Sequence, residues 1–194
     1  PGSHPNVDYE GYSSIARDIL REVKPDAVFV PVGNGTTLAG IWHGFLGRAN
    51  PRMVGVTTAL GNELLRKFYG DSRGEIAETP VNEPLVSETC FDLDEAMKAL
   101  KESNGYVFGF ADDTALRCAE LLRVTTGLSV LPTSALTVAG LIKFTRKFGV
   151  MEGNFVLVLT GGVHGGESVG AYGGALSYDG WENSARTRAV LGKV

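Results

Sequence analysis

Short apolar runs without polar alternation place the strongest constraint on how this 194-residue chain can fold. Residues 27–32, 53–57, 106–110 and 155–159 are rich in β-branched, leucine and aromatic side chains. Runs of this kind are typical of strands that are buried on both faces, as in parallel sheets. Helical patterns separate them, and parallel pairing requires such long crossovers. The sequence therefore predicts an α/β fold with three layers, an open, mostly parallel sheet with helices on both faces.

Apolar residues at helical spacing predict the helices. They are expected at residues 9–23, 38–45, 62–69, 93–100, 112–122 and 133–148. Asp92 stands at a capping position, and Pro132 suits a first helical turn. Residues 70–89 are charged and contain two prolines, which predicts a surface excursion. Residues 161–180 hold eight glycines and predict a loop of close turns, and the tail beyond has only a modest helical pattern.

Composition excludes several classes of function. The 18 basic and 22 acidic residues give a net charge of −4, which argues against nucleic-acid or anionic-membrane partners held by charge. The 26 glycines follow no Gly-X-Y period, so they indicate tight turns or close contacts rather than collagen. Cys90 and Cys118 form no Cys-x-x-Cys pair, so we expect free thiols, a cytoplasmic location and no metal site. No apolar stretch reaches the length of a membrane helix, and no signal peptide is expected.

The sharpest local motif is Gly33-Asn34-Gly35-Thr36-Thr37, between a predicted strand and a predicted helix. Glycines allow a tight turn, and amides and hydroxyls at a helix N-terminus can bind a phosphate. The same motif also suits an ordinary βα turn with a capping threonine. No lysine lies close enough for a Walker A loop, and Leu38 stands where a dinucleotide fingerprint has its third small residue. The remaining ligand is a single phosphate monoester, such as a sugar phosphate or pyridoxal phosphate.

Further candidate site residues follow later in the chain. Thr160 comes directly after the last predicted strand, and ligands of open α/β sheets bind beyond such carboxyl ends. Ser134 begins a helix, where proline in the first turn is ordinary helix chemistry. His164, inside the glycine loop, is a better candidate for contact with a substrate than His43, which is expected to pack or to lie at the surface. No Gly-x-Ser-x-Gly elbow supports a catalytic triad.

Together these motifs resemble, in order and spacing, the C-terminal portion of fold type II pyridoxal-phosphate enzymes, threonine synthase-like members most. The matching residues are Asn6, 9–11, 25–35, 52–56, 132–135, 139–141 and 156–161. The resemblance implies pyridoxal 5′-phosphate as cofactor. Its phosphate would be held by Gly33, Asn34, Gly35, Thr36 and Thr37, and its ring nitrogen by Thr160. Ser134, Gly161 and His164 would lie near the cofactor or the substrate.

The chain departs from the family pattern in ways that bear on activity. The family's Schiff-base lysine lies well before the phosphate loop, whereas only Lys24 precedes Gly33 here. We therefore expect residues 1–194 to be a single large-domain fragment, without the small domain, the lysine or any catalytic residue of its own. The start at Pro1 without a methionine fits either a vector scar or the interior of a longer protein. Leu131 replaces a frequent acidic residue, and residues 161–166 replace a Gly-x-Gly-x-Lys pattern.

The resemblance implies that the parent enzyme catalyses elimination or replacement at the β or γ carbon of an amino acid. The most similar members convert O-phosphohomoserine to threonine in amino-acid biosynthesis, and the family is usually dimeric. Three alternatives stay open: another family member, such as a threonine or serine dehydratase or a cysteine synthase-like enzyme; a non-catalytic module that binds a phosphate ligand; and a nicotinamide-dependent oxidoreductase. The isolated fragment is expected to be inactive.

Overall fold

The computed structural model describes residues 5–70, 80–149, 152–161, 174–176 and 187–189. The helices are α1 (Pro5–Glu22), α2 (Thr36–Phe45), α3 (Glu63–Tyr69), the 3-10 turn η1 (Glu83–Leu85), α4 (Leu93–Glu102), α5 (Asp112–Thr126) and α6 (Pro132–Phe148). The strands are β1 (Ala27–Pro31), β2 (Arg52–Thr58), β3 (Tyr106–Phe110), β4 (Phe155–Leu157), β5 (Gly174–Leu176) and β6 (Thr187–Ala189).

The strands form one sheet in the order β3-β2-β1-β4-β6-β5. All neighbouring pairs are parallel except β5 and β6, which are antiparallel. Strand β1 is central, and its Val28 lies in register with Met53 of β2 and with Val156 of β4. The chain first builds the sheet outward from β1 to β2 and β3, and then adds β4 on the other side of β1. The order of the strands therefore reverses between β1 and β4.

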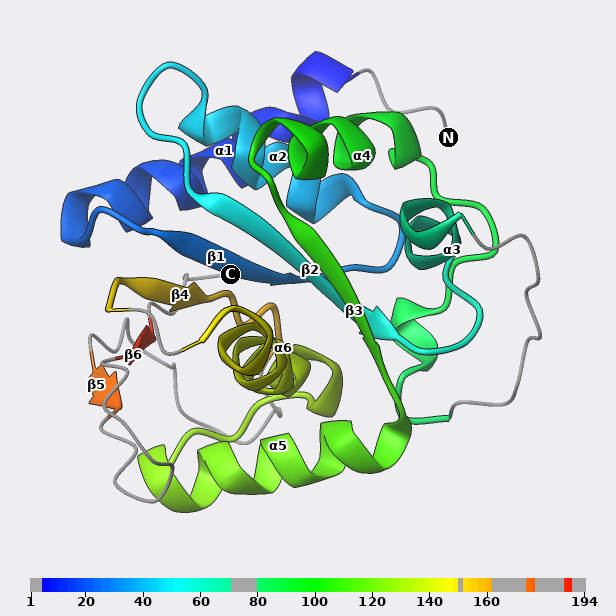
Figure 1. The fold of residues 1–194 in the computed structure, drawn as a ribbon, viewed down its shortest axis with the longest axis vertical. Coiled ribbons are helices and arrows are strands. Elements are labelled where there is room, and N and C mark those ends of the chain that lie inside the picture. The colour runs from blue at the N-terminus through cyan, green and yellow to red at the C-terminus, as the bar shows by residue number, and fades with distance from the viewer. Residues whose placement is uncertain (1–4, 71–79, 150–151, 162–173, 177–186, 190–194) are drawn as a thin grey trace.

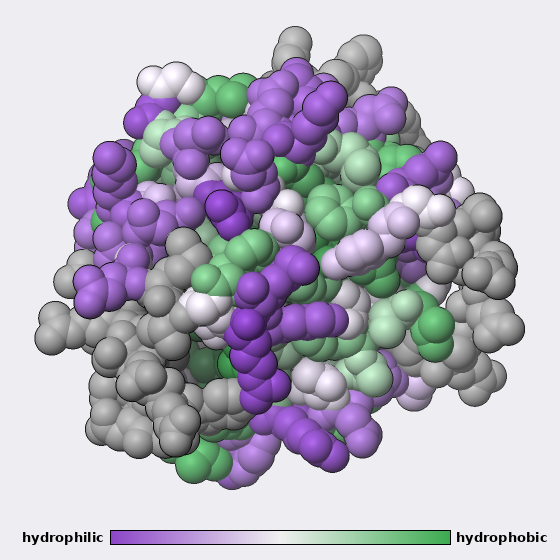
Figure 2. All heavy atoms as spheres, viewed as in Figure 1, coloured by the Kyte–Doolittle hydropathy of each residue, from purple (hydrophilic) through white to green (hydrophobic). Residues whose placement is uncertain are grey.

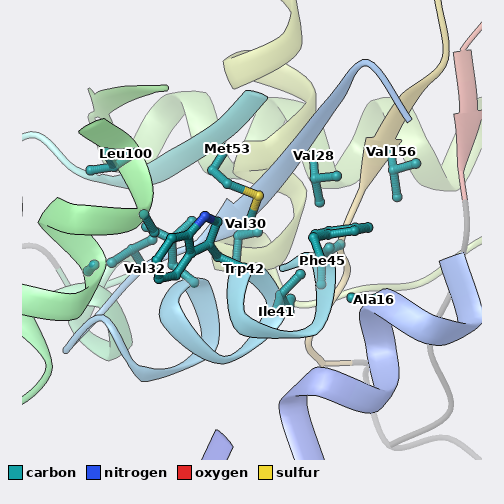
Figure 3. Packing of buried hydrophobic residues seen from close by; sticks show 14 of the residues in the cluster. Ala16, Val28, Val30, Val32, Ile41, Trp42, Phe45, Met53, Leu100 and Val156 are labelled. Carbon is teal, nitrogen blue, oxygen red and sulfur yellow. The ribbon is translucent and has the colours of Figure 1, made fainter. Parts of the chain in front are cut away.

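Helices cover both faces of the sheet, α1 to α4 on one side and α5 and α6 on the other (Figure 1). Alternate residues of β1 point to opposite layers: Val28 and Val30 pack towards α1 and α2, whereas Phe29 packs against Phe144 of α6. Figure 3 shows the first layer, where the β1 valines face the buried side chains of α2 such as Trp42. The predicted three-layer α/β fold, with strands buried on both faces, is confirmed.

The face on which β3 lies carries hydrophilic side chains across a hydrophobic centre (Figure 2). Strand β3 forms one edge of the sheet. The Nζ atom of Lys143 lies 5.3 Å and 5.2 Å from the ring centroids of Phe108 and Phe110, and that of Lys147 lies 5.4 Å from the ring of Tyr106. These lysines of α6 cover the aromatic side of the edge strand, and charge at a sheet edge opposes pairing with another chain.

One expectation from the sequence is wrong, and a second needs a qualification at two residues. The glycine-rich segment 161–180 and the tail beyond it were expected to contain a loop and a modest helix, but they contain strands β5 and β6. Each strand has only three residues, too few for a period to show. The sequence predicts a surface excursion at residues 70–89; in the described part, residues 70 and 80–89, most residues are exposed or half-buried, while Asn82 and Leu85 are buried. Helix α1 also begins earlier than predicted, at Pro5.

Candidate functional site

The reversal of strand order brings two predicted site segments to the same edge of the sheet. Residues 33–37 follow the carboxyl end of β1, and Thr160 follows the carboxyl end of β4. Strands β1 and β4 are direct neighbours. Ligands of open α/β sheets bind in the crevice outside the carboxyl ends, at the point where the strand order reverses. The topology therefore singles out this edge as the candidate site.

Helix α2 presents free backbone donors at this edge. Its N-cap residue, Gly35, has a left-handed backbone with φ of 95° and no side chain to cap the helix, and among the described amides Asn34 Oδ1 accepts only from that of Thr36, at 3.4 Å. The first helical hydrogen bond runs from Ala39 to the carbonyl of Gly35. Among the described residues, the amides of Gly35, Thr37 and Leu38 therefore have no acceptor, nor does the Thr37 hydroxyl have a partner. Such a helix terminus, with its partial positive charge, attracts an anion.

Asp92 lies behind the loop in a role that the sequence did not show. It stands at the N-cap of α4 as predicted, yet its side chain does not cap that helix. Instead Oδ1 accepts a hydrogen bond of 2.8 Å from the Tyr9 hydroxyl, and Oδ2 accepts one from the Thr36 hydroxyl. The Asp92 amide also donates to the carbonyl of Asn34, at 3.2 Å. One carboxylate thus connects α1, the start of α2 and the start of α4.

Asn62 fixes the loop from another direction. Its side chain is buried and caps α3, while Nδ2 lies 2.9 Å from each of the carbonyl oxygens of Gly33 and Leu85. The segment 80–89 consequently runs across the loop, and a Cβ atom on Gly33 would come within 3.1 Å of the Pro84 carbonyl oxygen. The sequence identified Asn62 only as the start of a helix, because its other partners are distant in the chain.

The second half of the site joins the end of β4 to the start of α6. The Oγ atom of Ser134 lies 3.1 Å from Oγ1 of Thr160, and either hydroxyl can be the donor. Ser134 is fully buried, whereas Thr160 is exposed. The Leu131 amide donates to the carbonyl of Gly161 at 3.1 Å, which holds the two segments side by side. The structure therefore brings together three of the predicted residues, Ser134, Thr160 and Gly161.

The sequence suggested roles for two histidines, His43 and His164. His164 lies outside the described residues. His43 is partly buried, where its ring stacks on Tyr9 with centroids 4.7 Å apart and its Nε2 lies 2.9 Å from Oε2 of Glu95. It therefore packs as expected. Both cysteines are free and buried, and burial raises the pKa of each thiol.

Two hollows in the described part of the molecule are lined by residues outside the loop at 33–37. One, of about 410 Å³, borders Tyr9, Cys90 and Asp92 behind the loop. The other, of about 1080 Å³, is an open groove at the amino edge of the sheet and includes Arg52 and Tyr106. Neither contains a predicted site residue. In the described residues no helix is long and apolar enough to span a bilayer, and no group of His, Cys, Asp and Glu is arranged for a metal ion.

Comparison with known proteins decides the family. The model of the pyridoxal-phosphate dependent enzyme family matches residues 1–161. The chain belongs to this family. The threonine synthase of Methanocaldococcus jannaschii is 27% identical over 172 residues, which are 80% of this chain and 42% of that protein. The threonine synthase of Synechocystis is 32% identical over 158 residues, 74% of this chain and 38% of that protein. The chain thus spans less than half the length of these curated relatives.

Solved structures of the family share the fold. The threonine deaminase of T.th. superposes with a TM-score of 0.63 at 21% identity, covering 82% of this chain and 58% of that one. A fungal L-serine ammonia-lyase from Rhizomucor miehei superposes with a TM-score of 0.64 at 19% identity, covering 80% and 52%. The cofactor of the family is pyridoxal 5′-phosphate, as the sequence predicted.

The site has the donors that this cofactor needs. A phosphate monoester at neutral pH is an acceptor of hydrogen bonds, and the start of α2 offers three amides and the Thr37 hydroxyl without acceptors among the described residues. A pyridine nitrogen needs one donor, and Thr160 carries an exposed hydroxyl at the neighbouring strand end. The residues present therefore fit the group. The chemistry-bearing residues that sequence reasoning missed are Tyr9, Asn62 and the side chain of Asp92.

Proposed function

We propose that this chain is the cofactor-binding large domain of a pyridoxal-phosphate dependent lyase or synthase of the threonine synthase type. The observation that carries the proposal is the meeting of two donor sets at the switch point between β1 and β4. One set is the uncapped start of α2, and the other is the exposed hydroxyl of Thr160. The family match over residues 1–161 and the threonine synthase relatives support the same assignment.

The cofactor phosphate is proposed to bind at Gly33–Thr37. The amides of Gly35, Thr37 and Leu38 and the dipole of α2 would stabilise its negative charge, and the Thr37 hydroxyl would donate a further hydrogen bond. Asn34 is exposed at the turn, and its Oδ1 lies 3.4 Å from the Thr36 amide. Asn34 therefore shapes the turn in addition to lining it.

Thr160 is proposed to bind the pyridine nitrogen. Ser134 is buried, so its hydroxyl can donate to Oγ1 of Thr160, which leaves the Thr160 proton for the nitrogen. A neutral hydroxyl does not hold that nitrogen protonated as a carboxylate would. When bound, the cofactor supplies a sink for the electron pair released at the α carbon of an amino acid. The protein contributes a single neutral hydrogen bond to the pyridine nitrogen.

The proposed reaction class is elimination or replacement at the β or γ carbon of an amino-acid substrate. The relatives named above are threonine synthases, so we favour conversion of O-phosphohomoserine to threonine, in amino-acid biosynthesis in the cytoplasm by a homodimer. A dehydratase-type reaction is the alternative within the family, and the deaminase and ammonia-lyase folds suit it equally.

A second candidate, a non-catalytic phosphate-ligand module, is favoured by the position of Lys24. Lys24 lies shortly before β1, and its carbonyl accepts a hydrogen bond of 3.1 Å from Asn154, which precedes β4. It therefore lies at the amino edge, opposite to Thr160, and cannot reach the proposed site. We propose that the catalytic lysine and the small domain are not part of residues 1–194. The chain alone should bind the cofactor's phosphate without amino-acid turnover.

Equilibrium dialysis with pyridoxamine 5′-phosphate tests the proposed site. This probe has the ring and the phosphate but no aldehyde, so surface lysines cannot react with it. We expect Thr37→Val to weaken its binding about tenfold, as loss of a hydrogen bond to a charged group implies. Thr125→Val removes an exposed hydroxyl on α5 and serves as the matched control. Binding that is absent from the wild-type chain, or unaffected by Thr37→Val, would show the proposed site to be wrong.

A further inference from the structure

The carboxylate of Asp92 is almost completely buried, with 8% of the residue exposed, directly behind the loop proposed to bind phosphate. It comes from the start of α4, whereas the loop precedes α2. A Cβ atom on Gly35 would come within 3.1 Å of the Asp92 carbonyl oxygen, so the two backbones are in contact. A buried carboxylate next to an anion site costs free energy unless hydrogen bonds compensate its charge. The hydroxyls of Tyr9 and Thr36 supply these hydrogen bonds.

The Thr36 hydroxyl is already committed to Asp92. A hydroxyl has one proton, and two acceptors surround this one: Oδ2 of Asp92 and, at 3.1 Å, Oδ1 of Asn34. The charged acceptor forms the stronger hydrogen bond, so the proton lies towards Asp92. Thr36 can then accept hydrogen bonds at the loop but cannot donate one. A phosphate dianion has no proton to offer, so this side chain is a poor ligand for it.

Tyr9 completes the arrangement from the other side. Its hydroxyl donates to Oδ1 of Asp92 at 2.8 Å, from a position 83 residues away in the chain. The Tyr9 ring is held by stacking on His43. The carboxylate is thus held between hydroxyls of α1 and α2, and it fixes the direction of the first side chain of α2. The neighbouring Thr37 keeps its proton available.

We propose that Asp92 is a positioning residue of the cofactor site, an inference that rests on the proposed function. By taking the proton of Thr36, Asp92 fixes the first turn of α2 so that the free amides and the Thr37 hydroxyl face the phosphate. Thr36, in contrast to the expectation from sequence, holds the loop rather than the phosphate. Asp92 touches neither cofactor nor substrate and acts through Thr36.

Two substitutions and their combination test this role in the 194-residue chain. Asp92→Asn and Thr36→Val should each weaken binding of pyridoxamine 5′-phosphate about tenfold, and leave binding of pyridoxamine, which has no phosphate, unchanged. Because both substitutions remove the same hydrogen bond between Thr36 and Asp92, the double variant should bind no more weakly than either single variant. Asp94→Asn makes the same charge change at an exposed position of the same helix and should have no effect.

Thermal unfolding, recorded for every variant, separates positioning from folding. Should Asp92→Asn be unfolded at the assay temperature, Tyr9→Phe removes the other donor to the carboxylate and should weaken phosphate-dependent binding about threefold. Tighter binding by Asp92→Asn would mean that Asp92 is only a repelling charge, and equal weakening of both probes would mean a general structural role. Additive effects in the double variant would also overturn the proposal. Binding that depends on Thr37 but not on Asp92 would refute this inference and leave the proposed function intact.

Discussion

Replacement of Gly35 by alanine is the perturbation that the geometry of the loop predicts most sharply. Gly35 has φ of 95° and ψ of −21°, a left-handed conformation that costs an L-residue about 1–2 kcal/mol. The added Cβ atom would also lie 3.1 Å from the Asp92 carbonyl oxygen and 3.1 Å from Cβ of Ala96. Overpacking against a helix start of this kind adds about 1–3 kcal/mol. We therefore expect a total loss of about 2–5 kcal/mol in the free energy of unfolding.

Gly127→Ala is the matched control for the backbone part of this cost. Gly127 caps α5 with φ of 75°, and no atom lies within 4 Å of the place that an added methyl group would take. At about 3 °C per kcal/mol for a domain of this size, Gly127→Ala should lower the Tm by about 5 °C and Gly35→Ala by about 10 °C. Circular dichroism during heating measures both values. Equal losses for the two variants would refute the close packing between the loop and α4.

The variants Gly35→Ala and Gly127→Ala also test where the ligand binds. At a hundredfold excess over Kd, a ligand that binds only the folded chain adds about 2.7 kcal/mol of stability. Pyridoxamine 5′-phosphate should therefore raise the Tm of the wild type and of Gly127→Ala, but not that of Gly35→Ala. An equal rise in both variants would contradict the placement of the phosphate at this loop.

Three other results are expected from the same contacts. Asn62→Ala removes a buried side chain that both caps α3 and holds two loop carbonyls, so it should cost about 2–4 kcal/mol in urea unfolding with an unchanged m-value. Ser134→Ala should weaken pyridoxamine binding about threefold in dialysis and leave inorganic phosphate binding unchanged, because it deprives Thr160 of its buried partner. Burial raises the pKa of the Cys90 and Cys118 thiols, so at about pH 8 a smaller fraction of each is ionised than in an exposed cysteine. A chromogenic disulfide reagent should therefore react slowly with the native chain and faster as the pH rises. After unfolding, the reaction should be immediate.

The sequence was sufficient for the parts of the fold whose signals are local. The run from Val28 to Val32 has no polar position, and both of its faces proved to be buried. The order of helices and strands likewise specified a parallel sheet, and the glycine turn marked the start of α2. Strands β5 and β6 were missed because segments of three residues show no period.

The sequence indicated candidate site residues where strands end or helices begin. The position of residues 33–37 and of Thr160 at one edge of the sheet was predictable because each directly follows a buried run. The role of Asp92 was not, since an aspartate before a helix reads as a cap, and nothing in the sequence indicates that Tyr9 reaches it from α1. The burial of Asn82 could not be predicted, because the charged residues and prolines of its segment are typical of a surface excursion.

The function proposed for this chain depends above all on the binding of a phosphate-bearing cofactor at the start of α2. A titration of the isotope-labelled chain with pyridoxamine 5′-phosphate, followed by amide nitrogen–proton correlation spectra, tests it residue by residue. The largest shifts should occur at the amides of Gly35, Thr36, Thr37 and Leu38, with Thr160 next. Shifts confined to the basic groove at the amino edge, around Arg52 and Lys101, would contradict it.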